Sequence, residues 1–400
     1  MKIILAFDSY KGCMTAKEAC QAARLGIEER WPDAEVLSLP LSDGGEGLLQ
    51  CLASAMQLDM ESVAVHGPLG DTVTAHYALS KGKRHGDSAE RRHGDSTGRR
   101  QEVSAERRQD DTLAEAAATD DLPTAYIEMA EAAGLTLVPA ERRNPLTATT
   151  YGVGEMMLDA LRKGARRLVM GLGGSATCDA GRGMLQCLKE NAERSRKKGN
   201  RDAPLWPADV EVVVACDVDN PLCGPRGAAR VFAPQKGATP EQVELLEQQL
   251  RNFALATAQA GIAPQEMMDA PGAGAAGGMG YALMAYLGAH LQSGIDLMLD
   301  SLHFDAHLAG ADLVVTGEGR SDSQTLMGKV PMGVLQRAKR QGIPCHLVSG
   351  QTEDTEALLH AGFSSVTSIN EGDRRPINQL MQKDVATENL RAAMGRLARE

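Results

Sequence analysis

The segment RLVMGLGGSATCDAGRGM, from Arg167 to Met184, decides how the rest of the chain is interpreted. Its first residues, Leu168 to Gly171, are apolar and predict a short buried strand that leads directly into a loop. Glycines in this loop can adopt a positive φ and let a ligand approach the backbone, while its hydroxyl groups can donate hydrogen bonds. The segment therefore predicts a phosphate-binding loop, with a tight turn that binds nothing as the simpler alternative.

Two glycine patterns also fit the dinucleotide-binding fingerprint G-x-G-x-x-G/A. They are formed by Gly171, Gly173 and Ala176, and by Gly272, Gly274 and Gly277. The fingerprint requires a strand before the glycines and, about 20 residues later, an acidic residue at the end of a second strand. Residues 189–202 are too polar for that second strand, and residues 265–271 form a poor first strand. The chain also contains no Walker A motif, so any nucleotide site is of a less common type.

Length and charge favour a soluble two-domain enzyme. The chain has 400 residues, of which 43% are hydrophobic, enough to fill two cores. A net charge of -11 argues against nucleic acid or an anionic membrane surface as a partner. The eight cysteines form no C-x-x-C pair and suit a reducing compartment. Because MKIILAF is too short for a signal peptide, we expect a cytoplasmic protein without a membrane segment.

Both ends of the chain alternate strands with helices. Buried strands are predicted at residues 2–7, 36–41, 312–316 and 345–348, with helices between them, which predicts a parallel sheet. Polar residues follow these strands: Asp8, Ser9 and Lys11 after the first, Asp43 after the second, and Glu318, Arg320 and Asp322 after the third. Ligands bind at the carboxyl ends of strands in open α/β sheets, so these residues are site candidates.

The middle of the chain has a different pattern. Residues 63–79 alternate like antiparallel strands, further strands are predicted at 125–129, 168–171 and 210–216, and a helix is predicted at 281–291. We therefore predict one domain from residues 1–63 and 290–400, and a second from residues 64–289. Within the second, residues 81–123 contain the near repeats RHGDSAER and RHGDSTGR and few apolar residues, which predicts a disordered insertion.

The motifs taken together resemble those of the bacterial glycerate kinase family. They are DSYKG at 8–12, LSDGGEG at 41–47, RNPLTATTYGVGE at 143–155, GLGGSATCDAG at 171–181, ACDVDNPLCGP at 215–225, APQKGATPE at 233–241, PGAGAAGGMG at 271–280 and TGEGRSDSQTLMGKVP at 316–331. They span nearly the whole chain in the family's order. The family usually has Asn and Gly where this chain has Cys178 and Ala180.

The resemblance implies an α/β fold in which a Rossmann-like (flavodoxin-like) parallel-sheet domain, built from both chain ends, carries a smaller mixed α/β domain between them. It also implies transfer of a phosphoryl group from ATP to the 2-hydroxyl of D-glycerate, with Mg²⁺, in the cleft between the domains. For the oligomeric state, a homodimer is left open.

Phosphoryl transfer needs aligned reactants, neutralised phosphate charge and a proton acceptor, and the sequence offers candidates for each. Those for the phosphates and the glycerate carboxylate are Gly173, Gly174, Ser175 and Gly274, with Lys11, Lys236 and Arg320 as cations. Asp179, Asp217 and Glu318 are candidates for holding Mg²⁺, and Asp43 or Asp322 for the base. Three alternatives stay open: attack by the 3-hydroxyl, an NAD-dependent hydroxy-acid oxidoreductase, and a nucleotide sensor without catalysis.

Overall fold

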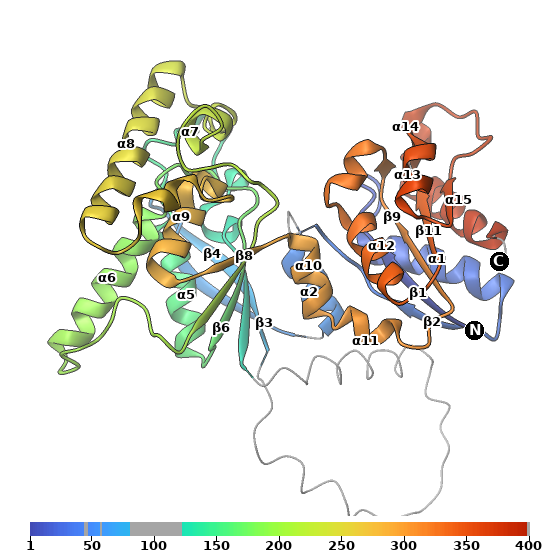
Figure 1. Cartoon of the computed structure of the whole chain (residues 1–400), viewed down its shortest axis with the longest axis horizontal. Coiled ribbons are helices and arrows are strands. Elements are labelled where there is room, and N and C mark those ends of the chain that lie inside the picture. Colours follow the sequence, from blue (N-terminus) through green and yellow to red (C-terminus); the bar gives the residue numbers. More distant parts are fainter. Residues whose placement is uncertain (44–46, 57, 81–121, 398–400) are drawn as a thin grey trace, which may run out of the picture.

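A computed structural model describes residues 1–43, 47–56, 58–80 and 122–397. Its strands form two main sheets, one made from the two ends of the chain and one from its middle (Figure 1). Both termini lie beside the sheet that the chain ends build (Figure 1). The predicted disorder of residues 81–123 concerns a segment that lies, except for its last two residues, outside the described part.

The chain ends form a five-stranded parallel sheet, as predicted. Its strands lie in the order β2 (Glu35–Ser38), β1 (Lys2–Phe7), β9 (Leu313–Gly317), β11 (Cys345–Ser349) and β13 (Ser365–Ser368). Numbered along this part alone, the order is 2-1-3-4-5, the flavodoxin-like order. Strand β2 therefore lies on one side of β1, whereas β9, β11 and β13 lie on its other side. The chain leaves β1 toward one face of the sheet and β9 toward the other, the arrangement beside which ligands bind in such folds.

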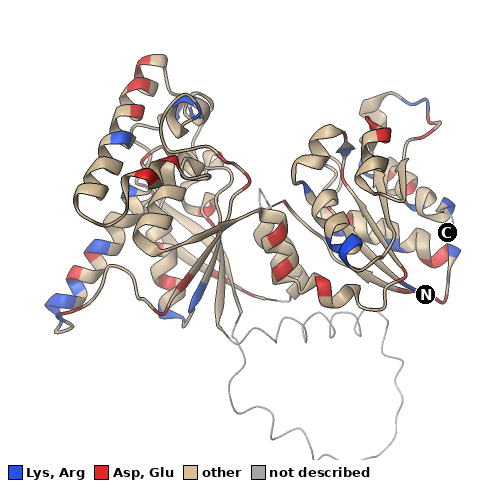
Figure 2. Cartoon of the chain, in the orientation of Figure 1, with Lys and Arg blue, Asp and Glu red and all other residues tan. Residues whose placement is uncertain are grey.

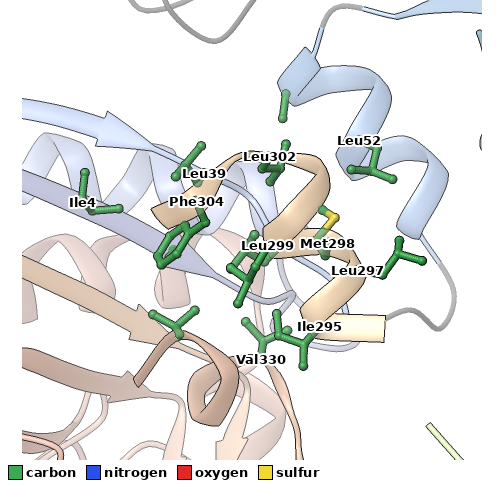
Figure 3. Packing of buried hydrophobic residues seen from close by; sticks show 14 of the residues in the cluster. Ile4, Leu39, Leu52, Ile295, Leu297, Met298, Leu299, Leu302, Phe304 and Val330 are labelled. Carbon is green, nitrogen blue, oxygen red and sulfur yellow. The ribbon is translucent and has the colours of Figure 1, made fainter. Parts of the chain in front are cut away.

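Helices cover both faces of this sheet because alternate residues of β1 point to opposite sides. On one face, Ile3, Leu5 and Phe7 pack with α1 (Ala16–Arg30) and α15 (Lys383–Arg396). On the other, Ile4 and Val314 pack with α2 (Leu48–Met56), α10 (Gly294–Ser301), α11 (Phe304–Leu308) and α12 (Val330–Arg340). Figure 3 shows side chains of α10 and α11 in this second core, among them Leu297, Leu299 and Phe304. Thr15 and Glu18 form a capping box at the start of α1.

The middle of the chain forms a six-stranded mixed sheet. Its order is β3 (Asp59–His66), β4 (Thr72–Ser80), β5 (Thr124–Glu128), β6 (Arg167–Gly171), β7 (Glu211–Ala215) and β8 (His290–Gln292). The pairs β3–β4 and β4–β5 are antiparallel, as residues 63–79 predicted, and the other pairs are parallel. The expectation that the middle part is the smaller of the two stays a prediction.

One face of this sheet packs against α2 and α10, and the middle part covers the other face with its own helices (Figure 1). The longer ones are α5 (Tyr151–Arg162), α6 (Arg182–Lys197), α8 (Pro240–Gln259) and α9 (Ala275–Leu287). The polar residues from 189 onward form the second half of α6, whose basic last turn is visible in Figure 2. Shorter elements are α4 (Ala130–Ala133), α7 (Ala228–Phe232), β10 (Arg320–Ser321), β12 (Gln351–Thr352), α13 (Thr355–Ala361) and α14 (Ile377–Leu380).

Two sequence predictions concern the region around residue 290: the end of a helix and a domain boundary. The helix predicted at 281–291 ends at Leu287, because Gly288 takes a left-handed φ of 66° and the chain continues as β8. Strand β8 pairs with β7, and β3 contains residue 63, so both strands at the predicted domain boundaries belong to the six-stranded sheet. The division at 63 and 290 stays a prediction.

Candidate active site

A cleft of about 1330 Å³ runs between the carboxyl ends of the two sheets. From the five-stranded sheet it is lined by the residues after β1 and β2, among them Asp8, Ser9, Lys11, Ser42 and Asp43. From the six-stranded sheet it is lined by Leu172–Ser175, Ala215–Val218, Gln235, Lys236, Ala275 and Ala276. The cleft thus combines the crevice beside β1 with the glycine loop after β6. Its volume exceeds that of a typical pocket for one drug-sized ligand.

Lys236 is the buried cation of the cleft. Only 3% of its surface is exposed, and its Nζ donates hydrogen bonds of 2.7 Å to Ser175 Oγ and to the carbonyl oxygen of Thr177. Burial lowers its pKa to about 8. Lys236 forms no ion pair with a carboxylate in the described part of the chain, and its two partners leave one of three donors free. A buried ammonium without a counter-charge indicates an anionic ligand.

The second glycine segment supports the first. Gly277 has a φ of 68°, and a Cβ atom there would lie 2.1 Å from the carbonyl oxygen of Thr177. Its own carbonyl accepts a hydrogen bond of 3.0 Å from the amide of Ala180. At Gly274 a Cβ atom would lie 2.3 Å from the carbonyl oxygen of Pro221. These glycines allow close backbone packing behind the loop, so Gly274 is a packing residue, although its neighbours 275 and 276 line the cleft.

Asp8, a site candidate from its place after the first strand but without an assigned chemical role, belongs to the site. It ends the central strand β1, is 7% exposed, and lines the cleft. Its Oδ1 accepts a hydrogen bond of 2.6 Å from the amide of Ser9. Burial raises its pKa to about 7, and the charge of Asp43 adds to this effect. In the sequence, Asp8 was indicated by its place directly after the first strand. The structure places the end of that strand in the cleft.

Asp217 enters the cleft from the six-stranded sheet, directly after β7. Its Oδ1 accepts a hydrogen bond of 2.8 Å from the amide of Gly294 at the start of α10. Burial raises its pKa to about 6, and the charge of Asp43 contributes to the shift. Asp43 therefore acts on carboxylates of both walls, and Asp8, Asp43 and Asp217 form the acidic part of the cleft.

Asp179, the carboxylate of the glycine loop, points away from the cleft. Its Oδ2 accepts hydrogen bonds from the amide of Thr150 at 3.0 Å, from the Thr150 hydroxyl at 2.8 Å and from the amide of Gly183 at 3.1 Å. Its Oδ1 accepts one of 3.0 Å from the amide of Gly181. The carboxylate satisfies the free amides at the start of α6 and joins them to the start of α5. Asp179 is thus placed to stabilise the loop, apart from the residues that line the cleft.

The three predicted residues after β9 also lie apart from the lining of the cleft. Glu318 is 5% exposed, and its Oε1 accepts hydrogen bonds from Ser321 at 3.1 Å and Thr325 at 2.6 Å. Arg320 points outward and donates to Glu353 at 2.8 Å. Asp322 caps the following turn through the amide of Gln324. The structure therefore gathers Lys11, Asp43, Asp217, Lys236 and residues 173–175 around the cleft, and leaves Glu318, Arg320 and Asp322 in a separate loop.

Comparison with known proteins identifies the family. The model of the glycerate kinase family matches residues 3–400. The chain belongs to the glycerate kinase family. It is 39% identical to the glycerate 2-kinase of Escherichia coli K12, over 92% of this chain and 91% of the relative. It is also 39% identical to the glycerate kinase of Bacillus subtilis 168, over 93% and 91% of the two chains.

A solved structure resembles the whole chain. The crystal structure of a protein assigned as glycerate kinase 2 from Salmonella typhimurium LT2 superposes with a TM-score of 0.75 at 36% identity, covering 99% of this chain and 96% of that one. The sequence-based expectation of an enzyme of the glycerate kinase family is thus confirmed. In the described part of this glycerate kinase family member, no helix is long and apolar enough to cross a membrane.

Proposed function

We propose that this chain is a glycerate 2-kinase that transfers the γ-phosphoryl group of ATP to the 2-hydroxyl of D-glycerate with the help of Mg²⁺ in the cytoplasm. The observation that carries the proposal is the buried, unpaired ammonium of Lys236 beside the glycine loop. An anion that replaces the missing counter-charge is expected there, and a triphosphate brings several negative oxygens to one site.

The phosphates lie along the glycine loop in this proposal. The backbone at Gly173 and Gly174 can approach phosphate oxygens closely, because Gly174 has a φ of 70° and no side chain stands between it and the cleft. The hydroxyl of Ser175 and the free donor of Lys236 then bind the same phosphates. As negative charge moves toward the β-phosphate in the transition state, Lys236 stabilises it.

The site also suits Mg²⁺. No group of three His, Cys, Asp or Glu side chains among the described residues forms a complete metal cage. Mg²⁺ bound with a nucleotide needs only one or two carboxylates, since phosphates and water complete its shell. Asp217 would hold it, because its Oδ2 receives no hydrogen bond from the described residues and its burial next to other carboxylates favours a cation. When bound, the ion would neutralise phosphate charge and orient the γ-phosphoryl group.

Glycerate is assigned to the five-stranded wall. Lys11 is the predicted cation on this wall and is placed to bind the glycerate carboxylate, whereas Arg320 is engaged with Glu353. The carboxylates of Asp8 and Asp43 lie on the same wall and can receive a proton from a hydroxyl group. The acceptor thus faces the phosphates across the cleft, as an in-line transfer requires.

Incubation of the protein with D-glycerate, ATP and Mg²⁺, followed by phosphorus NMR, tests the proposal. We expect the signal of 2-phosphoglycerate and its loss when EDTA removes the Mg²⁺. A 3-phosphoglycerate signal would support the kinase activity and contradict attack by the 2-hydroxyl. Absence of any phosphorylated product, next to an active control kinase, would overturn the proposed function.

A further inference from the structure

Asp8 lies at the end of β1, next to the point in the five-stranded sheet where the order of the strands changes direction. It directly follows β1, the strand between β2 and β9, and the helices that follow β1 and β9 cover opposite faces of the sheet. A strand end is a rigid support, so the carboxylate is held in a fixed position in the crevice. Of its surface, 7% is exposed, and that part belongs to the cleft.

One oxygen of this carboxylate is bound and the other is available. The amide of Ser9 donates to Oδ1 at 2.6 Å, which fixes the orientation of the group. Oδ2 receives no hydrogen bond or ion pair from any residue that the structure describes. Because Asp8 lines the cleft, this oxygen is the one that a bound ligand can reach.

The charged surroundings of Asp8 favour the protonated form. Asp43 faces it from the segment after β2, and Glu318 from the loop after β9, and both are negative. Lys11 on its own loop acts in the opposite sense, and Cys51 on α2 is a further ionisable neighbour. Burial, together with these charges, raises the pKa of Asp8 to about 7, close to the working pH, the condition under which a carboxylate accepts a proton most effectively during catalysis.

We infer that Asp8 is the catalytic residue that accepts the proton of the attacking glycerate hydroxyl through its Oδ2. The inference builds on the proposed kinase activity and names a residue for its proton transfer. Asp43 then acts as a positioning residue, because its charge keeps the proton affinity of Asp8 high without itself receiving the proton. Lys11, by binding the glycerate carboxylate, brings the hydroxyl toward the same loop.

The step balances without any further reactant. The hydroxyl oxygen of glycerate forms a bond to the γ-phosphorus while the bond from that phosphorus to the bridging oxygen of ATP breaks. The electron pair of the broken bond stays on the β-phosphate of ADP, and the hydroxyl proton moves to Oδ2 of Asp8. Asp8 later releases this proton to water as the product leaves.

The test compares Asp8→Asn, which keeps the shape of the side chain, with Asp33→Asn, a matched change at an exposed aspartate of the same part of the chain. We measure kcat and KM for D-glycerate against pH, and follow thermal unfolding of each variant. For Asp8→Asn we expect kcat to fall by about 100-fold or more with a much smaller change in KM, and Asp33→Asn to match the wild type.

The pH profile provides a readout that needs no change at Asp8. The wild-type kcat/KM should fall as the pH decreases through about 7, because a protonated Asp8 cannot accept a proton. Asp43→Asn should move this acidic limb to lower pH, because it removes a negative charge next to Asp8. An acidic limb that stays in place in Asp43→Asn would contradict the role given to Asp43.

Three results would overturn the inference. In the first, Asp8→Asn keeps more than about a tenth of the wild-type kcat. In the second, its kcat recovers at high Mg²⁺, which would make Asp8 a metal ligand instead. Both leave the kinase proposal standing, because the wild type still turns over. In the third, the wild type does not phosphorylate glycerate at all, and the proposed function falls together with the inference.

Discussion

The loop after β6, residues 172–181, and the loop after β9, residues 318–329, look alike in sequence and differ in what they do. Both leave the carboxyl end of a parallel strand, and both combine glycines, hydroxyl groups and acidic residues. The first turns its glycines and Ser175 into the cleft beside Lys236. The second closes on itself, with Glu318 surrounded by the hydroxyls of its own loop.

The difference lies in where each acidic group finds its donors. Glu318 takes hydrogen bonds from Ser321 and Thr325, three and seven residues further along, and Lys329 lies 3.4 Å from its other oxygen. Asp179 likewise takes its donors from nearby helix starts. Lys236, in contrast, finds only neutral acceptors. A buried charged group whose hydrogen-bond or ion-pair partners lie within the protein stabilises the fold. A buried charged group that forms no ion pair indicates a ligand of opposite charge.

Lys236→Met tests the loop after β6 where we expect the largest effect. Removal of the buried ammonium should lower kcat/KM for ATP by about 100-fold or more, since a charge-stabilising group is lost. The fold should survive, because a buried charge without a counter-ion gives way to an apolar side chain of similar length. Steady-state kinetics and thermal unfolding measure both effects, with the exposed Lys198→Met as the matched control. Near-normal turnover by Lys236→Met would place the phosphates elsewhere.

The titration of Lys236 offers a second test of the same loop. Its pKa of about 8 in the free protein means that it carries its charge below that pH and loses it above. Because ADP binds the charged form better, its affinity should weaken up to about tenfold for each pH unit above 8 and be little affected by this group below. Calorimetric titration with Mg²⁺ and ADP between about pH 7 and about pH 9.5 measures this. The dependence should vanish in Lys236→Met; the same slope in both proteins would exclude Lys236 as its origin.

Asp179→Asn tests whether the acid of the first loop is structural. The amide cannot accept all four hydrogen bonds that the carboxylate receives, and we expect a loss of about 2–3 kcal/mol in the free energy of unfolding. Urea denaturation measures the loss, and Asp209→Asn, at an exposed aspartate of the same part, is the control. At a temperature where the variant stays folded, kcat should stay within a few-fold of the wild type. A large loss of kcat in an Asp179→Asn protein that stays folded would indicate a catalytic role for Asp179.

Sequence patterns predicted most strands of the sheets, because a buried strand leaves a run of apolar residues in its own sequence. Apolar runs placed most strands and helices within a few residues. The helix predicted at 281–291 was too long, because Gly288 ends it and a short strand at the sheet edge follows. The order of the strands in the sheet of the middle part was not predicted, because no local pattern encodes it.

The candidate site was harder to predict because side-chain direction is not local. Gly173, Ser175, Lys236, Asp217, Asp43 and Lys11 do line the cleft. Asp179, Glu318, Arg320 and Asp322 sit in equally suggestive motifs, but each finds partners within its own loop or the next one. Asp8 was named as a candidate from its place after the first strand but was given no role, because its importance comes from the position of β1 between β2 and β9, which only the sheet order reveals.

Arg320→Ala tests the loop after β9 where we expect the smallest effect. The Arg320 side chain is 57% exposed, and its pairs with Glu353 and Asp322 lie at the surface, where ion pairs contribute about 1 kcal/mol or less. We therefore expect kcat and KM for glycerate to stay within about threefold of the wild type, as they should in the control Glu353→Ala. A KM for glycerate raised by about tenfold or more in Arg320→Ala alone would mean that the arginine leaves Glu353 and binds the substrate carboxylate. The loop after β9 would then belong to the site in the bound enzyme, and its contrast with the loop after β6 would hold only for the free protein.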